Sequence, residues 1–299
     1  EIAFMGKTYT VEEATFDSFK GIDIALFAGG SISKDFAPHA VKAGAVVIDN
    51  SSAFRMDPEV PLVVPEVNPQ AILKHKGIIA NPNCSTIIMV MALKPIYDLA
   101  KIKRVIVSTY QAVSGAGKEG IDELDAQVRE HSEGREMTAN ILPSASAEKH
   151  YPIAFNLIPQ IDVFCDNLYT KEEMKMVNET KKIMEDYEMR ITATTIRVPV
   201  YRSHSESVNI ELEKEVDLGA MREALAKFPG VTVQDDPSKQ EYPMPLYTSE
   251  KDDVYVGRLR RDESCEKSYN MWVVGDQIRK GAALNTLQIA ETMIKNGWI

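Results

Sequence analysis

The sequence has few cysteines. Its 299 residues include only Cys84, Cys165 and Cys265, and none of them forms a Cys-x-x-Cys pair. Three cysteines cannot build a disulfide framework, and the absence of the pair removes the usual zinc and redox motifs. We therefore expect no metal site, and a protein of a reducing compartment, the cytoplasm.

Basic residues are also in the minority. Lys and Arg number 34 and Asp and Glu number 44, which gives a formal charge of −10. A nucleic-acid-binding protein is expected to have the opposite balance. No apolar run approaches the roughly 20 residues that a bilayer span needs, and the first residues have none of the parts of a signal peptide. We therefore expect neither nucleic acid nor a membrane as a partner.

What the chain does have is the composition and rhythm of a folded α/β protein. Hydrophobic residues make up 44% and charged residues 26%, both near the globular average. Apolar runs at Asp23–Phe27, Ala45–Asp49 and Gly77–Ala80 alternate with polar stretches, which is typical of βαβ units and a parallel sheet. A long apolar helix from Ser85 and further strand-like runs from Lys103 onward then predict a second domain.

The segment NPNCST at positions 81–86 carries the strongest chemical signal. Cys84 lies there between the strand-like GIIA and the apolar helix, so it stands at a helix N-terminus. Unpaired N–H groups and the helix dipole at such a position favour the thiolate over the thiol. The pattern indicates a nucleophile, but a small buried residue at a strand end would give the same pattern.

His204 is the histidine best placed to serve such a nucleophile. The other four histidines fall in polar, loop or helix-like stretches. The inward face of the alternating strand HSESVNIELE would hold His204, Glu206, Val208, Ile210 and Leu212. A polar pair at the start of an apolar face suggests a cleft, and a satisfied histidine at a strand end is the alternative.

Arg197 and the pair Glu172 and Lys175 point to an anionic substrate. Arg197 interrupts the apolar run ITATTIRVPV, where it needs an ion-pair partner or a ligand anion. Because Arg197 and His204 are seven residues apart, a regular strand would turn them to opposite faces, so Pro199 or a bulge must intervene if both line one site. Structural ion pairing is the alternative for Arg197, and a solvated surface contact is the alternative for Glu172 with Lys175.

Glu172 and Lys175 belong to a predicted amphipathic helix at Glu172–Tyr187. Residues three apart are neighbours on a helix face, so their side chains should meet. We expect one side of this helix to be buried, and that side would carry Met174, Val177, Ile183 and Met184.

Two glycine-rich turns follow strand-like runs. One turn holds Ala28, Gly29 and Gly30, and the other holds Ser114, Gly115 and Gly117. Such turns let the backbone approach a phosphate or a flat ring closely. Neither is a full dinucleotide fingerprint, and each is weak evidence singly.

Over essentially the whole chain, the sequence resembles the bacterial aspartate-semialdehyde dehydrogenase family. The segments that carry the resemblance are VVIDNSSAFRM, VPEVN, NPNCST, STYQAVSGAG, KHYPIAFNLIPQID, YTKEEMKMVNETKKIM, IRVPVYRSHSESV and KGAALNTLQIAE. The resemblance implies an α/β fold with a Rossmann-type NADP-binding domain and an α/β catalytic and dimerisation domain. It places residues 1–83 and 276–299 in the first domain and residues 84–275 in the second.

The resemblance also implies an activity. The family catalyses the reversible, NADP-dependent reductive dephosphorylation of 4-phospho-L-aspartate to L-aspartate 4-semialdehyde, a step toward lysine, threonine and methionine. The protein would then be a homodimer or a dimer of dimers.

The family's functional residues fall on positions that match its motifs. Cys84 resembles the nucleophile that forms a thioester, and His204 the general acid/base. The residues that resemble substrate contacts are Gln111 for the acyl group, Arg197 for the carboxylate, Glu172 for the amino group, Arg55 and Lys175 for the phosphate, and Asn83 beside the nucleophile. The expected cofactor contacts are Ala28, Gly29, Gly30, Ser114, Gly115, Gly117 and Asn285.

The sequence departs from the family at its start. The family opens with a strand and a turn of the form Gly-Ala-Thr-Gly-x-Val-Gly, which binds the pyrophosphate, and nothing like it occurs here. We expect the missing segment to lie before Glu1, and the choice of NADP over NAD rests on the resemblance. The alternatives are a related acyl-phosphate reductase, such as N-acetyl-gamma-glutamyl-phosphate reductase, a non-catalytic paralogue, and a cysteine hydrolase.

Overall fold

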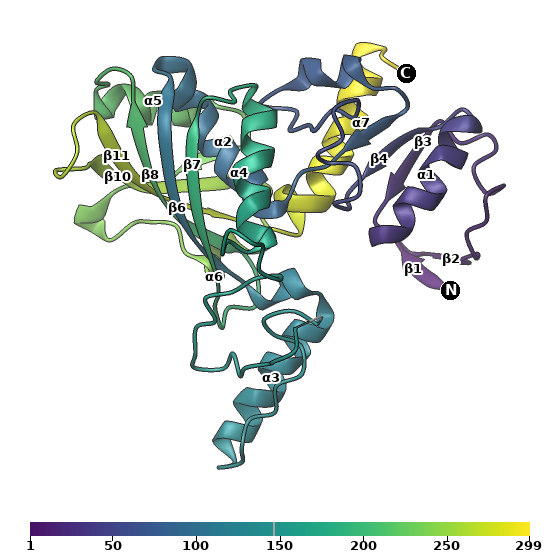
Figure 1. Ribbon diagram of the computed structural model, residues 1–299, viewed down its shortest axis with the longest axis horizontal. Coiled ribbons are helices and arrows are strands. Elements are labelled where there is room, and N and C mark those ends of the chain that lie inside the picture. The colour runs from purple at the N-terminus through teal and green to yellow at the C-terminus, as the bar shows by residue number, and fades with distance from the viewer. Residues whose placement is uncertain (146) are drawn as a thin grey trace.

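A computed structural model describes residues 1–145 and 147–299 and contains two main sheets. A three-stranded sheet has the order β3-β4-β5, and a six-stranded sheet has the order β7-β6-β8-β11-β10-β9. Figure 1 shows the small sheet at one side of the molecule and the large sheet at the other, with several helices between them. The alternating apolar runs of the first 83 residues and the later strands are thus both present as predicted.

The small sheet is parallel, as the βαβ rhythm predicted. Helix α1 (Ser33–Lys42) connects its first two strands, and a separate two-stranded hairpin precedes it. The strands of this region are β1 (Ile2–Phe4), β2 (Lys7–Tyr9), β3 (Ile24–Phe27), β4 (Val46–Asp49) and β5 (Ile78–Ala80). No described strand pairs with the outer side of β3, so the Ala28–Gly30 turn lies at the open edge of this sheet.

The C-terminal helix α7 (Leu284–Asn296) returns to the small sheet. Its Ile289 and Met293 are fully buried in one cluster with Ile48 of β4 and Ile79 of β5. Burial of these side chains holds the last helix of the chain against the first sheet (Figure 1).

The large sheet is built around β6, which pairs in parallel with β7 and antiparallel with β8. Helices α2 (Cys84–Leu99), α4 (Lys171–Met184) and α5 (Leu218–Lys227) bury the apolar side of this sheet in one large cluster (Figure 1). The strands are β6 (Ile102–Gln111), β7 (Arg190–Arg197), β8 (His204–Leu212), β9 (Val231–Val233), β10 (Val254–Arg261) and β11 (Ser268–Gly275).

The remaining elements are short or peripheral. Helix α3 (Lys118–Ser132) projects from the end of the sheet (Figure 1), and α6 (Pro245–Thr248) is a single turn. The other turns are η1 (Gly30–Ile32), η2 (Pro69–Lys74), η3 (Val113–Ala116), η4 (Pro237–Lys239) and the π-helical η5 (Arg279–Ala283). Among the described residues, none of the helices combines the length and the apolar character that crossing a bilayer requires.

Two predictions of buried faces, one for a strand and one for a helix, have different outcomes. The alternation predicted for β8 is confirmed, since His204, Glu206, Val208, Ile210 and Leu212 are all buried. The face predicted for α4 is wrong, because Met174, Val177 and Met184 are only partly buried and Ile183 alone of the four is fully covered. The buried face of α4 is mostly polar, with Glu172, Glu173, Met176, Glu179, Thr180 and Ile183. It is polar because this helix lies over the site described next.

Candidate active site

The ends of several elements meet at one edge of the large sheet. Because β6 and β7 are parallel and β8 runs the opposite way, the last residues of β6 and β7 lie beside the first residue of β8. The register pairs Gln111 with Arg197 across β6 and β7. The amide nitrogen of Gln111 lies 3.5 Å from Nε2 of His204. Arg197 and His204 share the site because the chain leaves the sheet between them, which resolves their odd spacing.

Cys84 opens helix α2 beside this edge. The preceding residue, Asn83, is the N-cap, and its Oδ1 accepts hydrogen bonds from the N–H groups of Ser85 and Thr86 at 3.1 and 3.2 Å. The position at a helix N-terminus is therefore confirmed. The expected lowering of the thiol pKa is wrong: burial raises the pKa of Cys84 to about 12, and the Glu172 carboxylate adds to the rise. Arg55 and Arg197 oppose it without outweighing burial.

His204 is fully buried and uncharged. Its Nδ1 accepts a hydrogen bond from the backbone N–H of Ala112 at 3.0 Å, which assigns the ring proton to Nε2. Burial, and then the Arg197 charge, lower the pKa of His204 well below its ordinary value. The ring therefore faces the site as a neutral N–H donor.

Glu172 connects the turn that holds Asn83 and Cys84 to β6. Its Oε1 accepts from Nδ2 of Asn83 at 2.9 Å and from Nε2 of Gln111 at 3.2 Å. Thr109 Oγ1 donates to the Gln111 carbonyl at 3.0 Å, which fixes the orientation of that amide. Burial alone would raise the pKa of Glu172, but Lys175 and the two amide donors hold it below its ordinary value. Glu172 is thus an ionised carboxylate inside the site.

Arg197 is buried with spare hydrogen-bonding capacity. Its Nη1 donates to the Ala112 carbonyl at 2.6 Å, and its buried Nε has no hydrogen-bond partner among the residues that the structure describes. A buried guanidinium with a free N–H suits an incoming anion, because an unpaired buried donor is costly.

Arg55 and Lys175 approach the same region from different elements. Arg55 Nη1 lies 3.2 Å from Oε1 of Glu179, and its buried Nε finds no partner within the described parts of the chain. The Lys175 ammonium lies 3.1 Å from both Glu172 and Asp162, which confirms the predicted contact with Glu172.

The two glycine-rich turns have different surroundings. Gly115 lies against two of the predicted site residues: a Cβ added there would be 2.8 Å from Nη1 of Arg197 and 3.3 Å from Cε1 of His204. Gly117 has a φ of +83°, which favours glycine. Ser114 accepts a hydrogen bond from the side chain of Gln277. Gly115 and the adjacent Ser114 therefore lie at the wall of the same site, whereas a Cβ at Gly117 would meet nothing within 4 Å.

Ala28 and Gly29 line a cavity of about 560 Å³ at the end of β3, together with Phe19, Phe36 and other residues. Gly30, next to them, has a φ of +64°. Asn285 lies elsewhere, with its Nδ2 donating to Val63 and Asn81 and its Oδ1 accepting from Lys280. Its side chain holds α7 against the strand end that precedes Cys84.

Sequence reasoning missed three contributors. Glu179 accepts hydrogen bonds from Arg55 and from the Asn83 N–H. The backbone of Ala112 accepts from Arg197 and donates to His204. Gly281 of η5 packs against Cys84. A Cβ at Gly281 would lie 3.0 Å from Cβ of Cys84. Only Glu179 gave a signal, since it follows Glu172 by seven residues, two helical turns.

Two family models match the chain. The semialdehyde dehydrogenase NAD binding domain matches residues 2–75, and the semialdehyde dehydrogenase dimerisation domain matches residues 93–280. Aspartate-semialdehyde dehydrogenase of Aquifex aeolicus is 57% identical over 100% of this chain and 87% of the relative. That of Bacillus subtilis is 53% identical over 99% of this chain and 86% of the relative.

A solved structure is similar to this chain as well. A crystal structure of aspartate semialdehyde dehydrogenase II of Vibrio cholerae, complexed with ASA, superposes with a TM-score of 0.91 at 46% identity. The match covers 98% of this chain and 86% of that one. With both domain models matched and close relatives aligned along its whole length, the chain belongs to the aspartate-semialdehyde dehydrogenase family.

Proposed function

We propose that this protein is an NADP-dependent aspartate-semialdehyde dehydrogenase that interconverts 4-phospho-L-aspartate and L-aspartate 4-semialdehyde through a Cys84 thioester. One observation carries the proposal: Cys84 and a neutral His204 share a site with two buried guanidinium groups, Arg55 and Arg197, each with an unpartnered Nε among the described residues. Two free cationic donors match the two anionic ends of an aspartyl phosphate.

Each charged group of the substrate has a counterpart. The Arg197 guanidinium binds the α-carboxylate, the ionised Glu172 binds the α-ammonium, and Arg55 with Lys175 binds the phosphate. Glu172 argues against an N-acetylated glutamyl phosphate, whose blocked amine has no charge to offer a buried carboxylate. Binding of an ammonium to Glu172 also removes one cause of the raised pKa of Cys84.

The reaction proceeds in two halves. The Cys84 sulfur attacks the acyl carbon, and the bond from that carbon to the phosphate oxygen breaks. The thiol proton leaves with the departing phosphate, so a thioester remains on Cys84. Gln111, held by Thr109 and Glu172, is placed to orient the acyl oxygen. Hydride addition to the thioester carbon gives a thiohemiacetal, and the Nε2–H of His204 is placed to protonate its oxyanion. Return of that proton and release of the thiolate give the aldehyde.

The residues present fit a nicotinamide dinucleotide. The cavity at Ala28 and Gly29 lies at the carboxyl end of a parallel strand, where α/β sheets bind nucleotides. Gly115 has no Cβ, and this lets the backbone of its turn approach Arg197 and His204 closely. When bound, NADPH supplies the hydride. We propose direct contacts from Ala28–Gly30 and from Ser114, Gly115 and Gly117, and an indirect role for Asn285.

We further propose a domain division into residues 1–83 with 276–299 and residues 84–275, and a cytoplasmic location. Burial of Ile289 and Met293 against the small sheet supports the division. All three cysteines are free thiols, which suits a reducing compartment.

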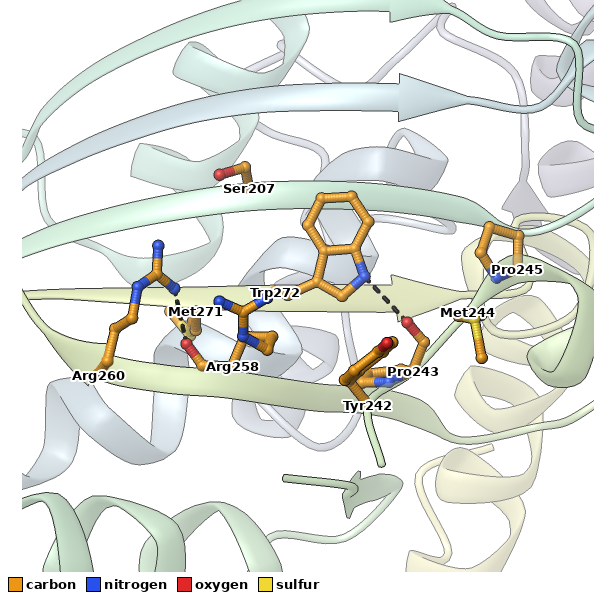
Figure 2. Close-up of a pocket in the computed structure, with 9 residues that line it drawn as sticks. All are labelled: Ser207, Tyr242, Pro243, Met244, Pro245, Arg258, Arg260, Met271 and Trp272. Carbon is orange, nitrogen blue, oxygen red and sulfur yellow. Dashed lines mark hydrogen bonds between the residues drawn. The ribbon is translucent and has the colours of Figure 1, made fainter. Parts of the chain in front are cut away.

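The face of the large sheet opposite helices α2, α4 and α5 is our proposed dimer interface, and the name of the matched dimerisation domain supports it. Half-buried Tyr110 and Trp272 lie with ring centroids 5.5 Å apart on that face. Figure 2 shows Trp272 beside Arg258 and Arg260 in a pocket of about 340 Å³. In this pocket Arg260 Nη1 donates a hydrogen bond to the Arg258 carbonyl at 2.9 Å (Figure 2). Trp272→Glu should therefore yield monomers in analytical ultracentrifugation, and an unchanged assembly would contradict this interface.

The activity is tested by phosphate-dependent reduction of NADP with aspartate semialdehyde, followed at the nicotinamide absorbance on the full-length protein. We expect reduction that requires phosphate and that Cys84→Ala abolishes. Reduction without phosphate would favour a hydrolytic or non-phosphorylating enzyme. No reduction at all would favour a non-catalytic paralogue.

A further inference from the structure

Glu179 is a buried carboxylate that the proposed chemistry does not use. It lies on the polar face of α4, two helical turns after Glu172, and its exposed fraction is 1%. Its two oxygens have different partners. Oε1 accepts from Nη1 of Arg55 at 3.2 Å, and Oε2 accepts from the backbone N–H of Asn83 at 2.6 Å. One side chain thus contacts the proposed phosphate site and the nucleophile's turn together.

The Arg55 side of this contact is ready for an anion. Arg55 Nη2 donates to the Asn50 carbonyl at 3.0 Å, and Nη1 donates to Glu179. The buried Nε remains without a partner in the part of the chain that the structure describes. Glu179 and Asn50 together fix the guanidinium plane and leave one edge of it free.

The Asn83 side of the contact controls the position of Cys84. Asn83 is the N-cap of α2 and its amide also donates to Glu172, so its side chain and its backbone are held by two carboxylates of one helix. Cys84 is the next residue in the chain. A shift of the Glu179 carboxylate would therefore move the turn that aims the thiol.

We propose that Glu179 is a positioning residue that couples phosphate binding at Arg55 to the Asn83–Cys84 turn. The proposal rests on the proposed function for the identity of the anion. A phosphate that shares the Arg55 guanidinium weakens its attraction for Oε1, and the released carboxylate then changes the strength of its hydrogen bond from the Asn83 N–H to Oε2. Binding of phosphate at Arg55 thereby changes the position of the Cys84 thiol.

Charge balance is consistent with such a role. Burial raises the pKa of the Glu179 carboxyl above its ordinary value, although Arg55 and the Asn83 N–H oppose the rise. Once phosphate competes for Arg55, this carboxyl can take up a proton more easily. Two anions are then not forced to share one guanidinium.

Glu173 provides a matched control on the same helix face. It is also buried, but it forms a capping box with Thr170, and its Oε1 accepts from the Thr195 N–H at 2.9 Å. These contacts hold the helix in place and touch neither Arg55 nor Asn83. Glu173→Gln should therefore report the cost of removing a buried charge from α4 alone.

The first test compares Glu179→Gln and Glu173→Gln in the full-length protein. For Glu179→Gln we expect the KM for phosphate to rise about tenfold or more, and the KM for aspartate semialdehyde to change less than about twofold. Glu173→Gln should leave both KM values near those of the parent. Equal changes in the two KM values for Glu179→Gln would overturn the coupling.

The second test does not depend on turnover. Iodoacetamide alkylation of Cys84, quantified by peptide mass spectrometry, is measured without phosphate and at phosphate concentrations that saturate each variant. We expect phosphate to change the rate in the parent and in Glu173→Gln, and to leave it unchanged in Glu179→Gln. A phosphate effect that survives in Glu179→Gln would overturn the proposal, even if the parent showed no dehydrogenase activity.

A third measurement needs no variant and so covers the case in which Glu179→Gln does not fold. Hydrogen exchange at the Asn83 amide of the parent protein is followed with and without inorganic phosphate. We expect phosphate to alter the protection of this amide. Unaltered protection at saturating phosphate would overturn the proposal.

Discussion

The two ends of the inner face of the large sheet differ sharply in what they bury. At the far end of the strands the face is apolar, with Val105 and Val107 of β6 beside Ile210 and Leu212 of β8. At the site end the same strands finish in buried polar groups, which are Thr109, Gln111, Arg197, His204 and Glu206. Strands β6 and β8 are ordinary core over most of their length, and each places buried polar groups at the two inward positions nearest this end.

The difference shows how the fold divides its tasks. Burial of the apolar end supplies stability at about 25 cal/mol per Å² of apolar surface. The polar end includes groups that cost stability, such as the free Nε of Arg197 and both carboxyl oxygens of Glu206, which are unpartnered among the described residues. Substitutions at the two ends should therefore affect different observables.

The largest effect on activity at the polar end is expected at His204, after Cys84 itself. His204→Gln removes the proton donor, so kcat should fall about 10²–10⁴-fold. Because Gln is neutral like the native ring, the free energy of unfolding should change little by comparison. Steady-state kinetics and urea denaturation check both parts, and a kcat within a factor of a few of the parent would contradict the assigned role.

At the apolar end, Ile210→Ala should do the reverse. Deleting this fully buried side chain leaves a cavity and should lower the free energy of unfolding by about 2–5 kcal/mol. The KM for aspartate semialdehyde should stay close to the parent value at temperatures where the variant is folded. A stable variant that has lost substrate affinity would show that the two ends are not separable.

A smaller effect is expected from Glu172→Gln on the thiol. The Glu172 carboxylate contributes to the raised pKa of Cys84, so its removal should lower that pKa and speed alkylation of Cys84 at pH 8 by about tenfold. Turnover should fall at the same time, because the group that binds the substrate's ammonium is gone. Alkylation that is equally slow or slower would argue against this electrostatic contribution.

The smallest effect near pH 5 is expected from Glu206→Gln, and it should grow as the pH rises. Burial raises the pKa of Glu206 well above its ordinary 4.5, so the folded protein holds this proton more tightly than the unfolded chain. The parent should lose stability as pH rises above about 4.5. Glu206→Gln removes that loss. In unfolding measured from pH 5 to 9, the free energy of unfolding of the variant should therefore rise relative to that of the parent as the pH increases. Parallel stability curves would contradict the assignment.

The sequence predicted most of the elements and the main site residues, each for a local reason. The alternation of β8 identified the inward row from His204 to Leu212, and the strand-to-helix change at NPNCST placed Cys84 at a helix start. The roles of Gln111, Arg55 and Asn83 came from the resemblance to the family, because nothing in their spacing distinguishes them.

What the sequence could not supply are effects of tertiary burial. The thiol pKa of Cys84 is raised where the helix terminus predicted a lowering, since desolvation depends on everything packed around the thiol. The prediction of the buried face of α4 failed for a related reason. This helix lies over the candidate site, so several of the side chains that it buries are carboxylates. Glu179 contacts Arg55 across 124 positions of sequence, which no local pattern reveals.

The central claim is that Cys84 carries the acyl group, and it can be tested directly. The full-length protein is mixed with NADP and aspartate semialdehyde without phosphate, quenched in acid and digested for mass spectrometry. We predict one aspartyl group on the Cys84 peptide, which disappears when phosphate is added before the quench. An unmodified Cys84 with reduced NADP in solution would contradict the thioester mechanism.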